Sequence, residues 1–478
     1  MNYKFLLIFL FSGLLFSCNK DITDNSSGSS TGTDTTTSTG STDYSKINKW
    51  IYEEMGSYYL WESKLPTVSS YSSPDPKTFY SSLLYTSSDK WSYITNDYAS
   101  LVSELSGTPT SMGYSPAFCL YNNNANVLIL VEYVYPGSPA ETAGLKRGDI
   151  ILTIDGTIMD STNYYTLYSK SSYTVELGTY SSATGKLSKS GKTMNMVAAQ
   201  IEANPAIYHS VIDYGGTKTG YLVYTEFVSG TTYQSALDDI FDDFYNQGVT
   251  NLIVDLRYNP GGSISTAGYL ASAIAPFSYV ASSAVLVNMN YNDLLNSYFY
   301  YYEGANSENL VYRFPYNYHN LNMSTVYFLT TSGTASASEL VISGLRPYMN
   351  SIIVGEPTYG KYTGAFVISD NNDTVNANWA IVPIVLKYSN AAGYTDFVDG
   401  LTPDYVVKDD LINAVPFGDT SDPQLAKALE LITGQTVTVT TKSVKVAPDL
   451  KRIIPKKMMI SKNLFVFKKD IRAVRSNK

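Results

Sequence analysis

The chain has 478 residues, 44% of them hydrophobic, which is enough for two or three domains with substantial cores. Its net charge of −9 is unevenly distributed along the sequence, since residues 451–478 hold ten Lys and Arg residues and a single acid. The rest of the chain is therefore acidic, which argues against nucleic acid as a partner. Two histidines, two cysteines and no nucleotide-binding glycine loop argue against zinc and nucleotide chemistry.

Residues 1–18 have the organisation of a secretion signal. A charged start is followed by the apolar run 5–16, which is too short to cross a membrane comfortably. The run ends in Leu15-Phe-Ser-Cys18, which resembles a bacterial lipobox and implies acylation of Cys18 after cleavage before it. Asn19-Lys-Asp21 resembles the surface-export tags of Bacteroidetes lipoproteins. We therefore expect a cell-envelope protein, lipid-anchored to a membrane (expected to be the outer membrane), in a periplasmic or surface-exposed position; the alternative is an ordinary signal with a chance cysteine.

Acylation of Cys18 leaves one thiol, Cys119, so no internal disulfide is expected. Cys119 lies in the apolar run Ala117-Phe-Cys-Leu120 and is predicted to be a buried packing residue.

A flexible linker is predicted for residues 19–42, which are Ser, Thr, Gly and Asp without apolar periodicity. Residues 43–105 are predicted to form a small helical domain. Ile47, Ile51 and Met55 recur at helical spacing, and further helical stretches are expected at 79–85 and 98–105.

Residues 106–205 show short β signals around one specific motif. Pro136-Gly-Ser-Pro-Ala140 leads into a short helix ending at Gly144, and strand 150–154 is followed by an Asp155-Gly156 hairpin turn. This pattern resembles a PDZ domain, which implies that an extended C-terminal peptide adds to a sheet edge. In that resemblance Met112, Gly113, Tyr114 and Ser115 occupy the place of the carboxylate-binding loop and are the expected substrate-binding residues. The alternative is a PDZ fold used only as a lid or spacer.

Residues 206–435 are predicted to be an alternating α/β region. Strands are expected at 220–227, 252–256 and 324–330, and helices at 233–245, from about 263 and from 336. Segments 352–354, 365–368 and 379–386 are expected to continue the same sheet, residues 280–323 to be irregular, and residues 422–431 to form a last helix.

Ser336 is the most informative residue of this region. Ser336-Ala-Ser-Glu339 matches a helix capping box, which by itself indicates only a helix start. The surrounding Gly333, Ala335 and Ala337 are small, and the serine follows a strand, so N–H groups of the turn are expected to face a ligand. A second turn, Asn259-Pro-Gly-Gly262, follows a neighbouring strand.

Four motifs together resemble the C-terminal processing peptidases, the S41 family of serine–lysine endopeptidases. They are Pro136-Gly-Ser-Pro-Ala140, Asp255-Leu-Arg-Tyr-Asn-Pro-Gly-Gly262, Thr334-Ala-Ser-Ala-Ser-Glu339 and Gly355-Glu-Pro-Thr-Tyr-Gly-Lys361. The resemblance implies that Ser336 is the nucleophile, that Lys361 is the general base, and that the N–H of Ala337 with that of Gly261 or Gly262 forms the oxyanion hole. It also implies an extracytoplasmic endopeptidase that works through an acyl-enzyme, needs no metal or organic cofactor, and takes polypeptides recognised by their C-terminus.

The predicted fold class is therefore multidomain α/β: a small N-terminal helical domain, a β-rich PDZ domain and a Clp-protease/crotonase-like α/β protease core. Residues 436–478 are predicted to be a basic tail, either a poorly ordered terminus or a segment that contacts anionic lipid or a partner. The oligomeric state stays open.

The proposed base sets physical demands. A free lysine has a pKa of about 10.4 and a useful base needs roughly 7–8, so Lys361 is expected to be buried and unpaired with Glu356. Many family members carry a glutamine four residues after the lysine; here that position is Ala365, and Thr363 is one substitute.

Two other readings stay open. One is a catalytically weak or inactive PDZ-based peptide-binding surface lipoprotein, and the other is a glycan-associated protein, suggested by the 43 tyrosines.

Overall fold

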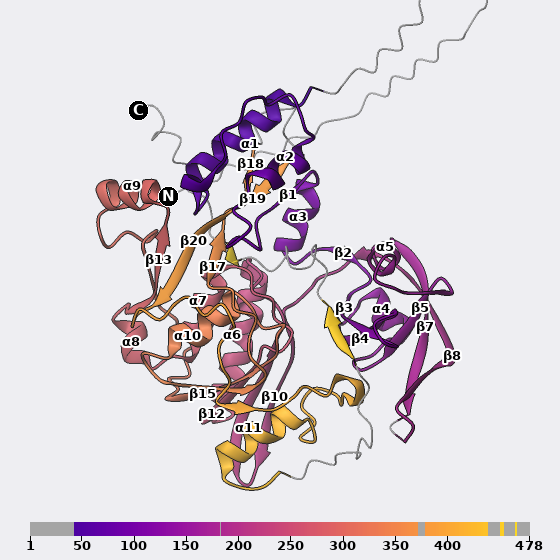
Figure 1. The fold of residues 1–478 in the computed structure, drawn as a ribbon. Coiled ribbons are helices and arrows are strands. Elements are labelled where there is room, and N and C mark those ends of the chain that lie inside the picture. Colours follow the sequence, from indigo (N-terminus) through magenta and orange to yellow (C-terminus); the bar gives the residue numbers. More distant parts are fainter. Residues whose placement is uncertain (1–42, 182, 371–377, 438–449, 454–463, 466–478) are drawn as a thin grey trace, which may run out of the picture. The chain divides into compact units, whose positions relative to one another are not determined.

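The computed structural model describes residues 43–181, 183–370, 378–437, 450–453 and 464–465 (Figure 1). Residues from Asp43 onward form one compact unit. The signal, Cys18 and the predicted linker lie outside the described residues. None of the described helices has the length and apolar content that a membrane crossing requires.

The N-terminal region, residues 43–105, contains the three predicted helices. They are α1 (Ser45–Tyr58), α2 (Pro76–Leu83) and α3 (Tyr98–Leu105). Helix α2 begins three residues before the predicted start at residue 79, because Pro76 fits the first helical position and Asp75 accepts the N–H groups of Lys77 and Thr78. The region is not purely helical: β1 (Tyr93–Thr95) pairs with β19 (Ala380–Val382), a strand nearly three hundred positions further along the chain.

The PDZ region, residues 106–205, is built around one antiparallel sheet in the order β3-β4-β5-β7-β8, with β22 added at the β3 edge. Gly144 ends the short helix α4 with φ of 86°, and Asp155 and Gly156 form the predicted hairpin turn with φ of 50° and 71°. The elements are β2 (Thr110–Ser111), β3 (Tyr114–Tyr121), β4 (Asn126–Val134), α4 (Pro139–Ala143), β5 (Ile150–Ile154), β6 (Thr157–Ile158), α5 (Tyr164–Tyr168), β7 (Ser172–Ser181), β8 (Lys186–Val197) and β9 (Ala199–Gln200).

The α/β core, residues 206–435, has a central sheet in the order β10-β11-β12-β15-β16-β21. All neighbouring strands are parallel except β10 and β11. These strands are β10 (Ala206–Tyr214), β11 (Thr217–Tyr224), β12 (Asn251–Asp255), β15 (Thr325–Thr330), β16 (Asn350–Gly355) and β21 (Tyr405–Val406). The main helices are α6 (Thr231–Asn246), α7 (Ile264–Ile274), α10 (Ala337–Leu345) and α11 (Pro423–Thr433).

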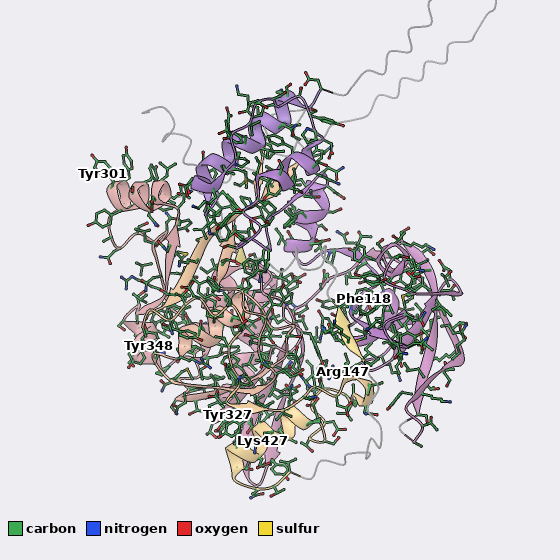
Figure 2. All side chains as sticks on the ribbon, in the orientation of Figure 1. Phe118, Arg147, Tyr301, Tyr327, Tyr348 and Lys427 are labelled. Atoms are coloured by element: carbon green, nitrogen blue, oxygen red, sulfur yellow. The ribbon has the colours of Figure 1, made fainter. Side chains whose placement is uncertain are left out.

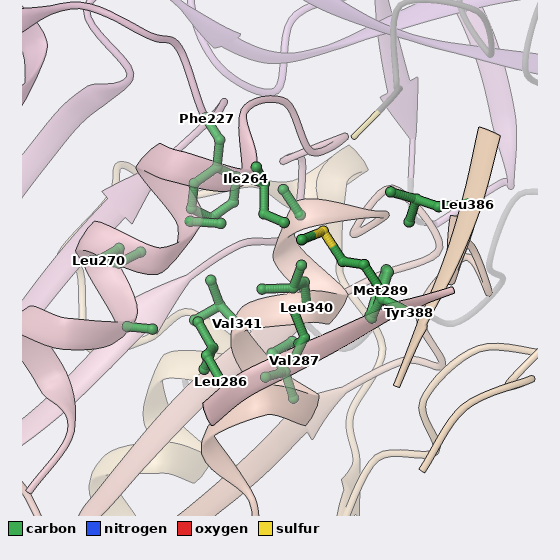
Figure 3. Close-up of a cluster of buried hydrophobic side chains, with 14 of the residues drawn as sticks. Phe227, Ile264, Leu270, Leu286, Val287, Met289, Leu340, Val341, Leu386 and Tyr388 are labelled. Carbon is green, nitrogen blue, oxygen red and sulfur yellow. The ribbon is translucent and has the colours of Figure 1, made fainter. Parts of the chain in front are cut away.

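One large hydrophobic cluster fixes the helix that starts at the candidate nucleophile. Leu340 and Val341 of α10 pack with Leu270 of α7 and with Leu286 and Val287 (Figure 3). All five side chains are fully buried, so both the axis and the rotation of α10 are set by packing. The other face of the central sheet packs against α11 through a separate cluster that includes Leu425 and Leu429.

The prediction that residues 280–323 are irregular is wrong. The segment forms α8 (Phe277–Ala281), β13 (Val285–Tyr291), α9 (Asp293–Glu303) and β14 (Val311–Arg313). One of the asparagines that suggested loops is a helix cap, since Asn292 accepts the N–H of Leu295 at the start of α9. Tyr301 on α9 is 80% exposed (Figure 2), so part of the tyrosine content is surface.

The prediction that three later segments continue the central sheet is confirmed for 352–354, which lies in β16, and wrong for 365–368 and 379–386. After β16 ends at Gly355, the chain leaves that sheet. β17 (Thr363–Ala365) and β20 (Ile384–Asn390) join a second sheet, in the order β14-β13-β20-β17-β23, and β18 (Ile368–Ser369) pairs with β19. Gly360 makes the departure possible, because its φ is 92° and a Cβ there would lie 2.4 Å from the carbonyl oxygen of Val398.

Candidate active site

Ser336 lies between β15 and α10 in a conformation that is rare for a side-chain-bearing residue. Its φ is 60° and its ψ is −110°, and the residue is fully buried. Its Oγ has no hydrogen-bond partner among the described residues. Backbone strain and an unsatisfied buried hydroxyl are together the signature of a functional group.

Glu339 joins the start of α10 to the loop that carries Lys361. Its Oε2 accepts the N–H of Ser336 and the N–H of Lys361, each at 2.8 Å. Its Oε1 accepts the hydroxyl of Thr358 at 2.5 Å and the N–H of Gly360 at 2.7 Å. Burial raises the pKa of Glu339, against these four hydrogen bonds, which lower it. The two candidate catalytic residues therefore share one carboxylate oxygen through their backbones.

Lys361 is fully buried, as a neutral base requires. Its Nζ lies 5.8 Å from the ring centroid of Trp91, within the range of a cation–π contact. The hydroxyl of Tyr388 donates to the carbonyl oxygens of Ser336, at 3.1 Å, and Lys361, at 3.5 Å, and so forms a second bridge between the two loops. The sequence reasoning treated Trp91 as core and did not single out Tyr388.

Two expectations around Lys361 can be compared with the structure. As expected, Glu356 makes no ion pair with a described residue; burial followed by the charge of Asp409 raises the pKa of Glu356. Ala365 is fully buried. The suggested substitute, Thr363, has an Oγ1 without a hydrogen-bond partner in the described part of the chain.

The glycine turn after β12 packs directly against Ser336. A Cβ on Gly261 would lie 2.7 Å from the Cβ of Ser336 and 3.0 Å from the nitrogen of Ala337. Asn259 holds this turn, since its Oδ1 accepts the N–H of Gly261 at 2.9 Å. That N–H is therefore already used. Within the described residues, the N–H groups of Ala337 and Gly262 have no acceptor, which makes them the two donors left for an oxyanion.

The expected substrate-binding loop divides into two pairs. The carbonyl oxygens of Met112 and Gly113 accept N–H groups from Ala140 and Tyr135, and both residues pack inside the PDZ region. Tyr114 and Ser115, by contrast, line a cavity of about 720 Å³.

This cavity extends from the PDZ region to the candidate catalytic loops. It is lined by β3, by residues of the N-terminal region from Tyr93 to Glu104, and by Pro260 and Gly333 of the two turns beside Ser336. Its charged lining is mostly acidic: Asp97, Glu104, Glu132 and Glu226 against Lys77 and Arg452. Burial, then the charge of Glu104, raises the pKa of Glu226 to about 8.

A second buried polar cluster lies at the end of β12. The guanidinium of Arg257 is 1% exposed and contacts Asp255 at 2.6 Å, Asp422 at 2.7 Å and Asp409 at 3.2 Å. Burial, the largest influence, raises the pKa of Asp422, but the charge and hydrogen bond of Arg257, the charge of Arg147 and the N–H of Leu425 together outweigh it, so that pKa is lowered. Arg147 of the PDZ region, labelled in Figure 2, donates to the Tyr258 hydroxyl at 2.7 Å, which ties the PDZ region to the α/β core.

No group of three or more His, Cys, Asp or Glu residues in the described ranges is arranged to hold a metal ion. Cys119 is buried, and burial raises the pKa of its thiol to about 11.

Comparisons with known proteins show which families this chain resembles. Three family models match the chain: the peptidase S41 N-terminal domain at residues 46–93, a PDZ domain at 130–165 and peptidase family S41 at 218–407. Their order confirms the predicted architecture of an N-terminal domain, a PDZ domain and an S41 core. The predicted domain boundaries and the likeness to the Clp-protease/crotonase superfamily stay predictions.

Curated relatives include two carboxyl-terminal-processing proteases. That of Picosynechococcus sp. is 27% identical over 341 residues, covering 70% of this chain and 73% of the relative. That of Synechocystis sp. is 28% identical over 309 residues, covering 62% and 63%. A crystal structure from Bacteroides fragilis, provisionally described as an S41 protease, matches with a TM-score of 0.64 at 28% identity, covering 80% of this chain and 97% of that one.

Proposed function

Since the chain belongs to peptidase family S41, and is thus a peptide hydrolase, we propose that it is a serine endopeptidase with Ser336 as nucleophile and Lys361 as general base. One observation carries this assignment. A strained, buried serine with an unpartnered hydroxyl shares the carboxylate of Glu339, through its backbone, with a fully buried lysine.

The reaction follows from these positions. The neutral amine of Lys361 takes the proton of Ser336 as Oγ attacks the scissile carbonyl carbon. The N–H groups of Ala337 and Gly262 stabilise the oxyanion that forms. The ammonium of Lys361 then protonates the leaving amine, and the amine so regenerated deprotonates the water that hydrolyses the acyl-enzyme. Burial favours the neutral amine between these steps. Every proton is exchanged between Lys361, Ser336, the substrate and water, so the cycle needs no cofactor.

Digestion of casein by the purified protein tests the assignment. We expect Ser336→Ala and Lys361→Ala to abolish proteolysis. Ser343→Ala is the matched control, because Ser343 lies on the same helix and its buried Oγ also lacks a partner among the described residues. Equal digestion by the native protein and the first two variants would refute the assignment.

We also propose that the enzyme is a lipoprotein held at the cell envelope by Cys18, acting on polypeptides outside the cytoplasm. The lipobox-like sequence before Cys18 supports this. Metabolic labelling with a radioactive fatty acid is expected to mark the native chain and not the Cys18→Ser variant. A label that persists in the variant would contradict the proposal.

A further inference from the structure

The C-terminal tail contributes a strand to the PDZ domain. β22 (Lys451–Ile453) pairs antiparallel with β3, in the register Lys451 with Leu120, Arg452 with Cys119 and Ile453 with Phe118. β3 is otherwise the edge of its sheet. In Figure 1 the yellow tail strand lies beside β3. An exposed edge of this kind is a site for adding an extended peptide.

Side chains reinforce the backbone pairing on two sides. The guanidinium of Arg452 forms an ion pair with Glu132 of β4, whose carboxylate also accepts the Ser115 hydroxyl at 2.6 Å. Glu132 is only 4% exposed, so this is a partly desolvated pair with a shared hydrogen bond. Ile453 packs on the PDZ core cluster that contains Phe118, which is labelled in Figure 2.

The same arginine reaches the α/β core. A Cβ on Gly333 would lie 3.7 Å from Nη2 of Arg452, and Gly333 belongs to the turn that leads to Ser336. Arg452 therefore stands in the cavity between the PDZ edge and the candidate nucleophile.

Charge favours the tail as the occupant of this cavity. The lining holds four acids, of which Glu226 is mostly protonated at neutral pH because its pKa is raised to about 8. Lys77 is the one other Lys or Arg side chain in the lining among the described residues. The tail from residue 451 holds ten basic residues and one acid. Opposite charge across such a contact favours this segment over the acidic remainder of the chain.

A second tail segment pairs close to the base. β23 (Leu464–Phe465) runs parallel to β17, with Gly364 opposite Leu464 and Ala365 opposite Phe465. β17 begins two residues after Lys361. Two separate strands of one tail thus add to the two sheet edges that flank the catalytic loops.

We propose that the tail is an intramolecular ligand of the β3 edge, that this site takes an extended internal segment with a basic side chain opposite Cys119, and that substrates must displace the tail. In the antiparallel register, Ile453 lies at the end of β22 that is nearer to the Met112–Ser115 loop. β22 is an internal segment of the chain, so the pairing seen at the β3 edge is made by an internal segment. The claim about substrates rests on the proposed function; the claim about binding does not.

A binding assay in the Ser336→Ala protein tests the proposal without proteolysis. The probe is a fluorescein-labelled peptide with the sequence of residues 445–455, measured by anisotropy. We expect it to bind the chain that ends at Leu450 roughly tenfold or more tightly than the full chain, because a docked tail reduces the binding-competent fraction. Equal affinities, or weaker binding by the shortened chain, would overturn the proposal.

Point variants in the full chain keep the test valid if the shortened chain does not fold. We expect Arg452→Glu to tighten binding of the probe, since it breaks the ion pair with Glu132. Lys451→Glu makes the same change of charge at an exposed neighbour and is expected to leave the affinity as it is. If the two variants change the affinity for the probe equally, the change is due to net charge alone, and the assigned site is wrong.

Cys119 offers an internal reporter of docking. It is 5% exposed opposite Arg452, and its alkylation by iodoacetamide can be followed by mass spectrometry of the peptide that contains it. Arg452→Glu is expected to speed this alkylation several-fold, and Lys451→Glu to leave it unchanged. An unchanged rate in Arg452→Glu would contradict tail docking. If the tail result holds while casein stays intact in the native protein, only the proposed function fails.

Discussion

Two buried polar clusters lie at the ends of the adjacent parallel strands β12 and β15, and they are satisfied in opposite ways. At β12, Arg257 meets three aspartates, and both positive and negative groups have partners. At β15, Glu339 accepts four hydrogen bonds, yet the hydroxyl of Ser336 beside it has no partner among the described residues. The first cluster has its charged groups paired, and the second leaves the hydroxyl of the proposed nucleophile without a described partner.

Three buried acids show how the local partners decide protonation. Asp422 faces Arg257, and its pKa is lowered in spite of burial. Glu339 has donors but no cation among the causes of its shift, and burial raises its pKa. For Glu226, burial and the charge of another acid, Glu104, both act upward, and its pKa rises to about 8. Burial acts in the same direction in all three, so the partner determines the outcome.

The largest expected effect separates activity from stability at Ser336. Ser336→Ala is expected to lower peptide hydrolysis roughly 10⁴-fold or more. Because the lost hydroxyl has no described partner, we expect the free energy of unfolding in urea to change by less than about 1 kcal/mol. A large loss of stability would mean that the Ser336 hydroxyl supports the fold, and the two clusters would then not differ in the way described above.

The second largest expected effect is a loss of stability at Arg257. Arg257→Met is expected to lower the free energy of unfolding by about 3–5 kcal/mol, because it leaves buried carboxylates without their cation. Urea denaturation measures this. Arg346→Met is the control, since Arg346 is only partly buried and forms no ion pair within the described residues. Equal effects in the two variants would show that the cluster at β12 has no special role.

The contact between the two turns can be tested at Gly261. Gly261→Ala is expected to lower kcat roughly 100-fold or more, because the added Cβ displaces Ser336 or the oxyanion donors. Gly137→Ala also places a side chain at a positive φ, 73° against 112° at Gly261, and has no atom within 4 Å of the added Cβ. If both variants retain activity, the turn does not position the nucleophile.

The smallest effect is a pH dependence at Glu226. Its pKa is raised from 4.5 to about 8, so the folded state binds more protons than the unfolded state between these values. The native protein therefore loses stability as pH rises through this window. We expect Glu226→Gln to be more stable than the native protein at pH 9, by on the order of 2 kcal/mol, and closer to it at pH 4.5.

Asp422 is expected to affect the pH dependence of stability in the direction opposite to that of Glu226. Its folded pKa lies below 3.8, so its contribution is present above that value and is lost as pH falls through the folded pKa. Asp422→Asn is expected to be destabilised at pH 7 and to lose less on further acidification. A parallel pH profile for the two variants would contradict the comparison of the three acids.

Local sequence signals were enough to predict the strand and the helix on either side of Ser336. The strand, the small residues and the start of α10 are encoded within a dozen positions, and Gly144 and Asp155-Gly156 likewise act through their own backbone. The burial of Lys361 was expected from the chemistry of a base, and the structure agrees.

Other features depend on contacts that no local pattern contains. Trp91 and Tyr388 reach the catalytic loops from distant strands and regions, and Glu339 gave only the signal of a helix cap. β17 and β20 join the second sheet because the chain turns at Gly360, which no local pattern indicates. The strand β13 was not predicted because its asparagines suggested a loop. The Asn259 contact that occupies the N–H of Gly261 also required coordinates.

Glu132 and Arg452 meet across 320 positions of chain. A ribosome makes the PDZ domain long before it reaches the tail, so the β3 edge, with its apolar Ala117-Phe-Cys-Leu120 run, is complete while its covering strand does not yet exist. During synthesis this edge is open to other chains. A nascent or truncated molecule is therefore the form most exposed to aggregation and to chaperone capture.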